Sequence, residues 1–263
     1  MEIQIEKNTK EPWDDRHKIV SALINKNGAE IAVELGVAFG GNSENILSNT
    51  NVKKLYGVDS YKNRWTYNDG MNKKQPELDY IYQKTIERLK KFGQRYEHIR
   101  KSSRDALKDT PNNLDFVYID ADHSYIGCLN DLRLWVPKVK VGGIIAGDDY
   151  HSKTSPGVTI AVNKYFKKLK WGGCAEGPHV WWVKKEKINP NLSFFNKLFL
   201  FNPIIRKIHF FLGEFYNATF GKFFFKTYFF RKRFKHKFRE VIKKILPNKL
   251  LVCLKKYHAK DTK

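Results

Sequence analysis

Cysteine is scarce in this sequence. The 263 residues contain Cys128, Cys174 and Cys253, which are far apart and odd in number. They provide neither a disulfide framework nor a closely spaced pair of metal ligands. This usage indicates a reducing compartment, so we expect the protein in the cytoplasm.

Long apolar runs are also missing. No stretch of about 18 uncharged apolar residues occurs, which argues against an ordinary transmembrane helix. The N-terminal stretch MEIQIEKNTKEPWDD is acidic and polar, with no apolar segment at its centre. We therefore do not interpret it as a secretory signal peptide.

The sequence lacks phosphate-binding glycine motifs, although it contains a glycine turn in residues 31–41, IAVELGVAFGG. A dinucleotide fingerprint needs glycine where Ala38 stands, and a P-loop needs Gly-Lys-Ser/Thr where Gly40 is followed by Gly41 and Asn42. What remains is an apolar strand that leads through a glycine turn into a helix, where a ligand can approach the backbone. The alternative is a turn that merely joins the strand to the helix.

Positive charge and phenylalanine are concentrated at the C-terminal end. The net charge is +22, and residues 188–263 hold 18 Lys and Arg against three Asp and Glu, together with 15 of the 19 Phe. We predict two parts with a boundary near Asn189 and Pro190. Residues 1–187 form a globular domain, and residues 188–263 form a basic, Phe-rich helical extension.

Apolar segments alternate with helical patterns along residues 1–187. Strands are predicted at 30–35, 54–58, 95–100, 114–120 and 142–149, and helices at 13–27, from 42, at 76–92, 124–135 and 158–170, with a closing hairpin in 171–184. Strands that are continuously apolar and alternate with helices predict a doubly wound, mostly parallel sheet covered on both faces. The expected fold class is therefore α/β and Rossmann-like.

Acidic residues mark the ends of four of these strands. They are Glu34, Asp59, Asp120 and the pair Asp148 and Asp149. Ligands of such sheets bind beyond the carboxyl ends of the strands, so we expect these acids to surround one site. Asp59 suits the diol of a ribose, and the turn before it has no lysine for a phosphate.

The motifs VELGVAFGG, YIDADHSY and VGGIIAGDDY together resemble class I S-adenosylmethionine-dependent methyltransferases, in particular methyltransferase family 24 and sugar O-methyltransferases of the macrocin type. The resemblance covers roughly residues 28–185. It implies the Rossmann-like fold and S-adenosyl-L-methionine as the methyl donor. Fold alone does not give the acceptor.

The resemblance also implies roles for particular residues. In the donor site, Glu34 lies near the methionine amino group, Gly36 and Gly40 contact the donor through their backbone, Asp59 binds the ribose, and Ser103 lies beside the adenine. In metal-dependent relatives a divalent cation is held by acids at the positions of Asp120, Asp148 and Asp149. Mg²⁺ prefers such oxygen ligands and could grip the hydroxyl to be methylated.

His123 and Asp120 are the predicted catalytic residues. An imidazole can take a proton from an attacking hydroxyl near neutral pH, and nearby carboxylates increase its basicity. Alternatives are Asp120 or Asp122 as the base, His151 as the histidine involved, or a purely structural role for these side chains. No serine or cysteine nucleophile motif is present, and methyl transfer needs none, because it depends mainly on alignment.

The extension alternates phenylalanine clusters with basic ones over residues 191–263. Its best amphipathic helix is predicted at 234–246, FKHKFREVIKKIL. Such a pattern favours binding at an anionic membrane surface, at the inner face of a membrane. Packing on the domain, oligomerisation and binding of nucleic acid are the alternatives, in that order.

The function expected from the sequence is O-methylation of a hydroxyl on a sugar or glycolipid intermediate, with S-adenosyl-L-methionine as donor and Mg²⁺ as a candidate helper. A nucleic-acid methyltransferase is an alternative suggested by the basic extension, but the core lacks an N-P-P-Y or D-P-P-Y signature. A further alternative is a binding module that keeps the fold without catalysis.

Overall fold

The computed structural model describes residues 15–64, 70–150, 152, 154–166, 173–174 and 179–186. The elements in this part are α1 (Asp15–Asn27), β1 (Ile31–Leu35), α2 (Gly41–Asn49), β2 (Lys54–Val58), α3 (Gln75–Leu89), β3 (Tyr96–Ile99), β4 (Leu114–Ile119), α4 (Tyr125–Trp135), β5 (Val139–Gly147), α5 (Pro156–Tyr165), β6 (Gly173–Cys174) and β7 (Trp181–Lys184), with short 3-10 helices at Lys90–Arg95, Asp105–Asp109 and Val136–Lys138. None of the described helices is long and apolar enough to cross a bilayer.

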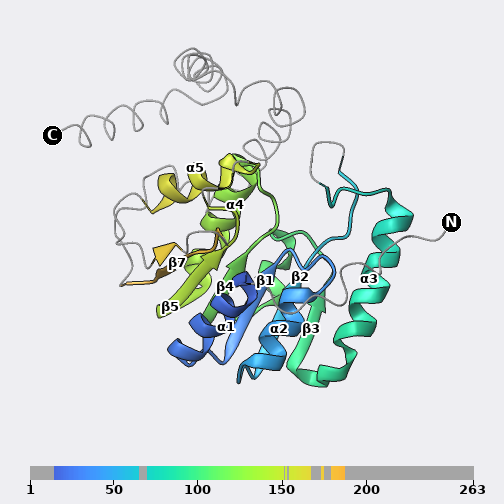
Figure 1. Ribbon diagram of the computed structural model, residues 1–263, viewed down its shortest axis with the longest axis horizontal. Coiled ribbons are helices and arrows are strands. Elements are labelled where there is room, and N and C mark those ends of the chain that lie inside the picture. Colours follow the sequence, from blue (N-terminus) through green and yellow to red (C-terminus); the bar gives the residue numbers. More distant parts are fainter. Residues whose placement is uncertain are drawn as a thin grey trace, which may run out of the picture. The chain divides into compact units, whose positions relative to one another are not determined.

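The sheet has the strand order β3-β2-β1-β4-β5-β7-β6 (Figure 1). Neighbours among β1 to β5 are parallel, whereas β7 pairs antiparallel with both β5 and β6. The first five strands thus follow the doubly wound order, in which the chain starts at the centre and proceeds first to one edge and then to the other. This confirms the predicted α/β, mostly parallel fold and the closing hairpin.

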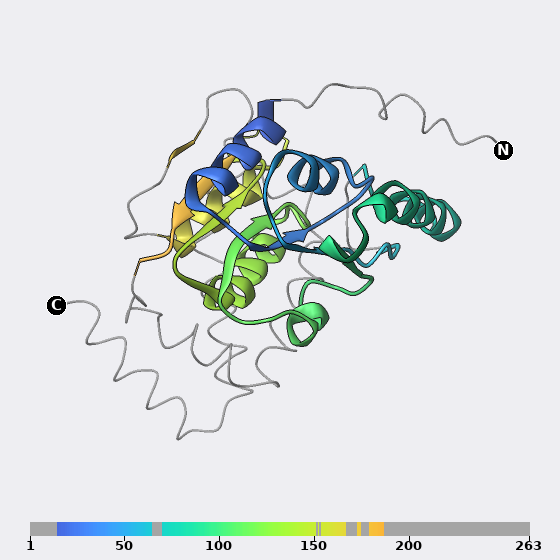
Figure 2. The same ribbon diagram turned by 90° about the horizontal axis from the view of Figure 1, so that it is seen from below.

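Helices cover both faces of the sheet. Seen from below, α1 and α2 lie on one face and α4 lies on the other (Figure 2). Continuous burial along β4, where all six residues are buried, follows from this double cover. Helix α5 packs against α4, and α3 packs beside α2.

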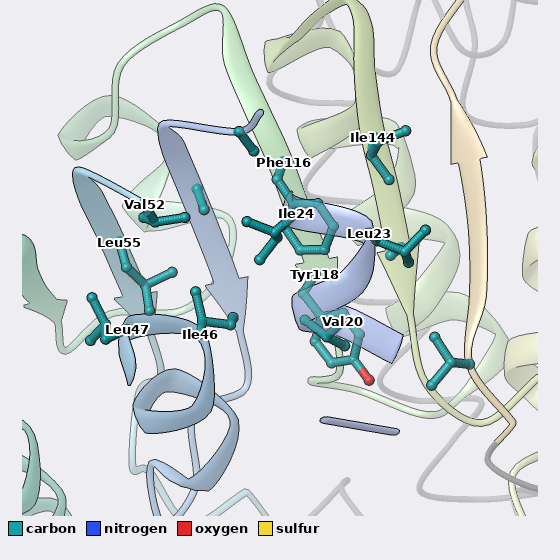
Figure 3. Close-up of a cluster of buried hydrophobic side chains, with 14 of the residues drawn as sticks. Val20, Leu23, Ile24, Ile46, Leu47, Val52, Leu55, Phe116, Tyr118 and Ile144 are labelled. Atoms are coloured by element: carbon teal, nitrogen blue, oxygen red, sulfur yellow. The ribbon is translucent and has the colours of Figure 1, made fainter. Parts of the chain in front are cut away.

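The main core lies between α1, α2 and the central strands. Ile24 and Val20 of α1 lie beside Phe116 and Tyr118 of β4 (Figure 3). Each fully buried side chain of this size contributes about 1.5 to 3 kcal/mol to folding. The apolar face predicted for helix 13–27 is therefore the face that fixes α1 on the sheet.

Several boundaries differ from those predicted. Strand β5 begins at Val139 and ends at Gly147, so Asp148 and Asp149 follow the strand instead of ending it. Helix α5 starts at Pro156, two residues earlier than expected, because proline fits the first turn of a helix. The end predicted at residue 170, like the extension 188–263, lies outside the described residues, so the two-part division stays a prediction.

Candidate functional site

The carboxyl ends of β1, β2, β4 and β5 lie at the same edge of the sheet. Leu35 pairs with Val58 and Ile119, and Ile119 pairs with Gly147. The ladder continues one residue further, since the Asp120 N–H donates to the Leu35 carbonyl at 2.9 Å and the Asp148 N–H donates to the Ile119 carbonyl at 3.3 Å. The strand-end acids predicted from the sequence therefore do meet at one edge.

The turn after β1 requires glycine at residue 36. Gly36 has a φ of 84°, and a Cβ built there would lie 1.9 Å from the carbonyl oxygen of Asp120. Gly40, with a φ of 76°, precedes α2, and a Cβ there would meet the Thr85 methyl at 3.0 Å. The backbone of this turn thus packs directly against the loop that carries Asp120, and a side chain at residue 36 would clash with that loop.

Asp59 holds the turn by its carboxylate. Its Oδ2 accepts hydrogen bonds from the Val37 and Ala38 N–H groups at 3.1 and 3.0 Å, and its Oδ1 accepts one from the Tyr61 N–H at 2.9 Å. Burial raises the pKa of Asp59 above its usual range, although these backbone donors oppose the shift. A carboxylate offers about four acceptor positions, so Oδ1 retains one for a ribose hydroxyl.

Glu34 is buried in β1, beneath the turn. Asn42 donates to its Oε1 at 2.9 Å, and the Ser43 hydroxyl donates to its Oε2. Burial raises the pKa of Glu34 to about 8, with the nearby charges of Asp120 and Asp59 adding to the shift. A cation close to this carboxyl, such as a ligand ammonium, would compensate its charge.

Helix α2 begins one residue earlier than predicted, and neither Asn42 nor Ser43 caps it. The residue before the first turn is Gly40, and the helix begins at Gly41 without a side-chain cap. The two side chains point instead to Glu34 and connect the start of α2 to β1. These two bonds could have been expected from the sequence, because a buried acid needs hydrogen-bond donors and Asn42 and Ser43 follow Glu34 within nine residues.

Ser103 follows β3 and contacts α4. Its hydroxyl donates to Oδ1 of Asp131, and its carbonyl accepts a hydrogen bond from the Trp135 indole at 3.1 Å. Burial raises the pKa of Asp131 to about 7. The predicted adenine contact of Ser103 is not tested by these bonds, but they fix the loop after β3 at the site's edge.

His123 lies between two of the strand-end acids. Its Nε2 is 3.0 Å from Oδ1 of Asp120 and 3.5 Å from Oδ2 of Asp149. Burial raises the pKa of Asp120 to about 6, and the charges of Asp148 and Asp149 act in the same direction, whereas His123 lowers it. The structure thus brings both predicted catalytic residues into direct contact.

The third acid of the predicted metal set is engaged elsewhere. Asp148 is buried, and its Oδ2 accepts from Nη1 of Arg16 at 2.5 Å while its Oδ1 accepts from the Asp149 N–H at 2.8 Å. Among the described residues, no group of three or more His, Cys, Asp or Glu side chains is arranged to hold a metal ion. These contacts do not fit a cation shared by Asp120, Asp148 and Asp149.

Arg16 was not predicted as a site residue. It lies four positions before Val20, and hence on the same face of α1 as the buried core residues. The sequence could have indicated its role, because Arg16 stands at the end of the apolar face of this helix. A charged side chain at such a position is expected to be buried or to have a charged partner. His151, the alternative histidine, lies outside the described residues.

Comparisons with known proteins cover the segment of the chain that carries these residues. Residues 33–150 match the model of methyltransferase family 24, described as a methyltransferase domain. These residues form a methyltransferase domain. The matched segment runs from β1 to the loop after β5, and so includes every predicted site residue.

One curated relative is a protein of Acanthamoeba polyphaga mimivirus described as uncharacterized protein R132. It is 30% identical over 146 residues, which cover 53% of this chain and 61% of that protein. The chain thus matches about three fifths of the length of this relative.

Two solved structures are similar to this chain. The calicheamicin methyltransferase CalS11 has a TM-score of 0.50 at 14% identity and covers 64% of this chain and 76% of its own. An O-methyltransferase from Bacillus cereus in complex with SAH has a TM-score of 0.48 at 13% identity, with 67% and 84% covered. At 14% identity the likeness to CalS11 concerns the fold alone.

Proposed function

We propose that the domain is an S-adenosylmethionine-dependent O-methyltransferase. The observation that carries the proposal is the meeting of two groups of residues at one sheet edge. Glu34, Gly36 and Asp59 lie on the β1 and β2 side, and Asp120 and His123 lie at the end of β4. The first group suits a methyl donor with an ammonium and a ribose diol, and the second suits a hydroxyl that must lose a proton.

The donor side fits S-adenosylmethionine by its chemistry. A buried carboxyl at Glu34 is complementary to an amino acid ammonium, and Asp59 keeps an acceptor position for a ribose hydroxyl. Gly36 lets the turn pack directly against the loop that carries Asp120, which brings the donor residues next to the acceptor side. When bound, the donor would supply a methyl group on a sulfonium, which leaves as a neutral thioether when the sulfur–methyl bond breaks.

The acceptor side acts on the proton of the attacking hydroxyl. His123 accepts this proton, and the carboxylate of Asp120, 3.0 Å from the imidazole, stabilises the imidazolium that forms. Alignment of the hydroxyl with the methyl group provides the remaining acceleration. No covalent intermediate with the protein is needed.

The acceptor that we propose is a hydroxyl of a sugar or glycolipid intermediate. Two features support it: the motifs resemble those of sugar O-methyltransferases, and the extension has the composition of a segment that binds an anionic membrane surface. A membrane-bound acceptor would be reached most readily by an enzyme held at the same surface.

Transfer of label tests this function. The full chain is incubated with S-adenosylmethionine labelled in the methyl group and with separate lipid, glycan and RNA fractions. Label in glycan or glycolipid that is stable to base supports the proposal, whereas label in RNA favours nucleic-acid methylation. Binding of the donor without transfer to any fraction would point to a binding module.

A further inference from the structure

An arginine from the first helix reaches the acceptor side of the site. Nη1 of Arg16, in the first turn of α1, lies 2.5 Å from Oδ2 of Asp148, which follows β5. The Arg16 side chain is 44% exposed, whereas that of Asp148 is 5% exposed. The pair therefore brings a permanent positive charge from the start of the domain to a nearly inaccessible carboxylate at the end of the central sheet.

Packing of α1 fixes the place of this charge. One turn after Arg16, Val20 is fully buried against the core that includes Tyr118 and Ile144 (Figure 3). At the same end of the helix, the Asn45 side chain of α2 donates to the His17 carbonyl at 2.9 Å. Arg16 thus extends from a helix that packs on the core and is hydrogen-bonded to α2.

The partners of the three acids form a continuous chain. Arg16 binds Asp148, and the Asp148 carboxylate accepts the N–H of Asp149, whose φ of 63° is left-handed. The Asp149 carboxylate in turn faces His123, which contacts Asp120. Arg16 is therefore the partner of Asp148, and His123 is the partner of both Asp120 and Asp149. Each acid lies next to a side chain that carries, or can carry, positive charge.

Carboxylates gathered at one edge repel one another unless a cation lies among them. In relatives that use Mg²⁺ this cation is the metal, whereas here a guanidinium already occupies one oxygen of Asp148 and a backbone N–H occupies the other. Mg²⁺ demands near-ideal octahedral geometry from its ligands. A metal would have to displace Arg16 to use all three acids.

We propose that Arg16 replaces the divalent metal of this site and makes methyl transfer independent of metal. It is a positioning residue: it neutralises Asp148 and, through Asp148, holds Asp149 beside His123. The proposal rests on the proposed function for its catalytic consequence, but its electrostatic part concerns the acids alone and is measured without any methyl transfer.

Binding of Mn²⁺ to the full chain tests the electrostatic part. Mn²⁺ is a paramagnetic probe for oxygen-ligand sites, and free Mn²⁺ is counted by electron paramagnetic resonance. Wild type is expected to show no site, and R16Q should bind Mn²⁺ at least tenfold more tightly. R16K, which keeps the charge, should resemble wild type, as should K18Q, which removes an exposed charge from the same helix.

Kinetics with chelator test the catalytic part on the fraction that accepts label. Wild-type activity should be unchanged by EDTA. R16Q should lose at least tenfold in kcat with little change in KM for the donor, and R16K should restore most of it. If Arg16 only stabilised the fold, R16Q would show neither a fall in kcat at an unchanged KM nor a new Mn²⁺ site.

Three results would overturn the proposal. They are a Mn²⁺ site in wild type, loss of wild-type activity in EDTA, and a folded R16Q that binds no more Mn²⁺ than wild type. If R16Q fails to fold, wild type and R16K still decide, since Mn²⁺ binding by either contradicts it. If no fraction accepts label, the proposed function fails while the Mn²⁺ measurements still stand.

Discussion

Glu34 is a carboxyl that the domain buries without a cationic side chain against it in the described contacts. Its hydrogen bonds come from Asn42 and Ser43, and burial raises its pKa to about 8. In the folded protein near pH 7, Glu34 therefore holds a proton in most molecules. A bound ammonium would favour the charged form, so we expect donor binding to release a proton.

Replacement of Glu34 by glutamine changes the pH dependence of stability. Because the pKa of Glu34 rises from 4.5 to about 8 on folding, its contribution is fully present below pH 4.5 and is lost as pH rises through 8. E34Q removes this loss, which is about 5 kcal/mol at most. Urea denaturation at pH 5 and pH 9 measures it, and E34Q should lose clearly less stability than wild type between them.

The matched control is E97Q, which removes a half-exposed carboxylate from β3. It should follow wild type at both pH values. An E34Q protein with the same fall in stability as wild type would show that Glu34 is ionised in the folded state, and would contradict the burial argument.

His123 is the residue whose replacement should affect the chemical step most directly. H123Q removes the group that accepts the hydroxyl proton beside Asp120, so kcat should fall by about 10²- to 10⁴-fold. Calorimetry should show unchanged donor binding, because His123 lies on the acceptor side. A kcat within threefold of wild type would assign the proton to another base, with Asp120 the next candidate.

At the scale of elements, the turn between β1 and α2 packs against the loop that follows the neighbouring strand β4. A Cβ at Gly36 would lie 1.9 Å from the Asp120 carbonyl oxygen, and the φ of 84° is unfavourable for alanine. We expect G36A to lower the free energy of unfolding by about 2 to 5 kcal/mol. Urea denaturation of the full chain measures this loss.

Gly28 supplies the control for this substitution. It also has a positive φ, 57°, but a Cβ there has nothing within 4 Å. G28A should therefore cost about 1 to 2 kcal/mol, which is the backbone term alone. Equal losses for G28A and G36A would mean that contact with the strand-end loop does not matter.

The order of elements was predictable because the described chain alternates apolar strands with amphipathic helices. Each strand of the parallel sheet was located within about three residues at either end. Strand-end position also predicted that Asp59, Asp120 and Asp148 share an edge, since the carboxyl ends of parallel strands align.

The contacts across elements could not be predicted in this way. The pairing of Arg16 with Asp148 joins residues 132 positions apart, and it depends on where α1 packs. The bonds from Asn42 and Ser43 to Glu34 depend on the exact start of α2, which lies one residue before the predicted start at 42. The sequence pattern predicts which face of a helix is buried and at which edge of the sheet a residue lies. The side-chain partners on other elements depend on how the elements pack.

For the whole molecule, the unequal distribution of charge predicts membrane association. Residues 188–263 combine 18 basic residues with 15 Phe, so the full chain should float with vesicles that contain anionic lipid and not with zwitterionic ones. Substitution of Lys237, Lys243 and Lys244 by Gln should weaken flotation, as should high salt. Equal flotation with both vesicle types would show that the basic residues do not bind the anionic lipid.

Binding of S-adenosylmethionine, followed by calorimetry on the full chain, tests the central claim most directly. Wild type should bind one donor per chain, with release of a proton near pH 7 that appears as a buffer-dependent heat. D59N, which keeps an acceptor for the turn but loses a carboxylate oxygen, should bind at least tenfold more weakly. A folded wild-type protein that gives no binding heat in any buffer would contradict the account.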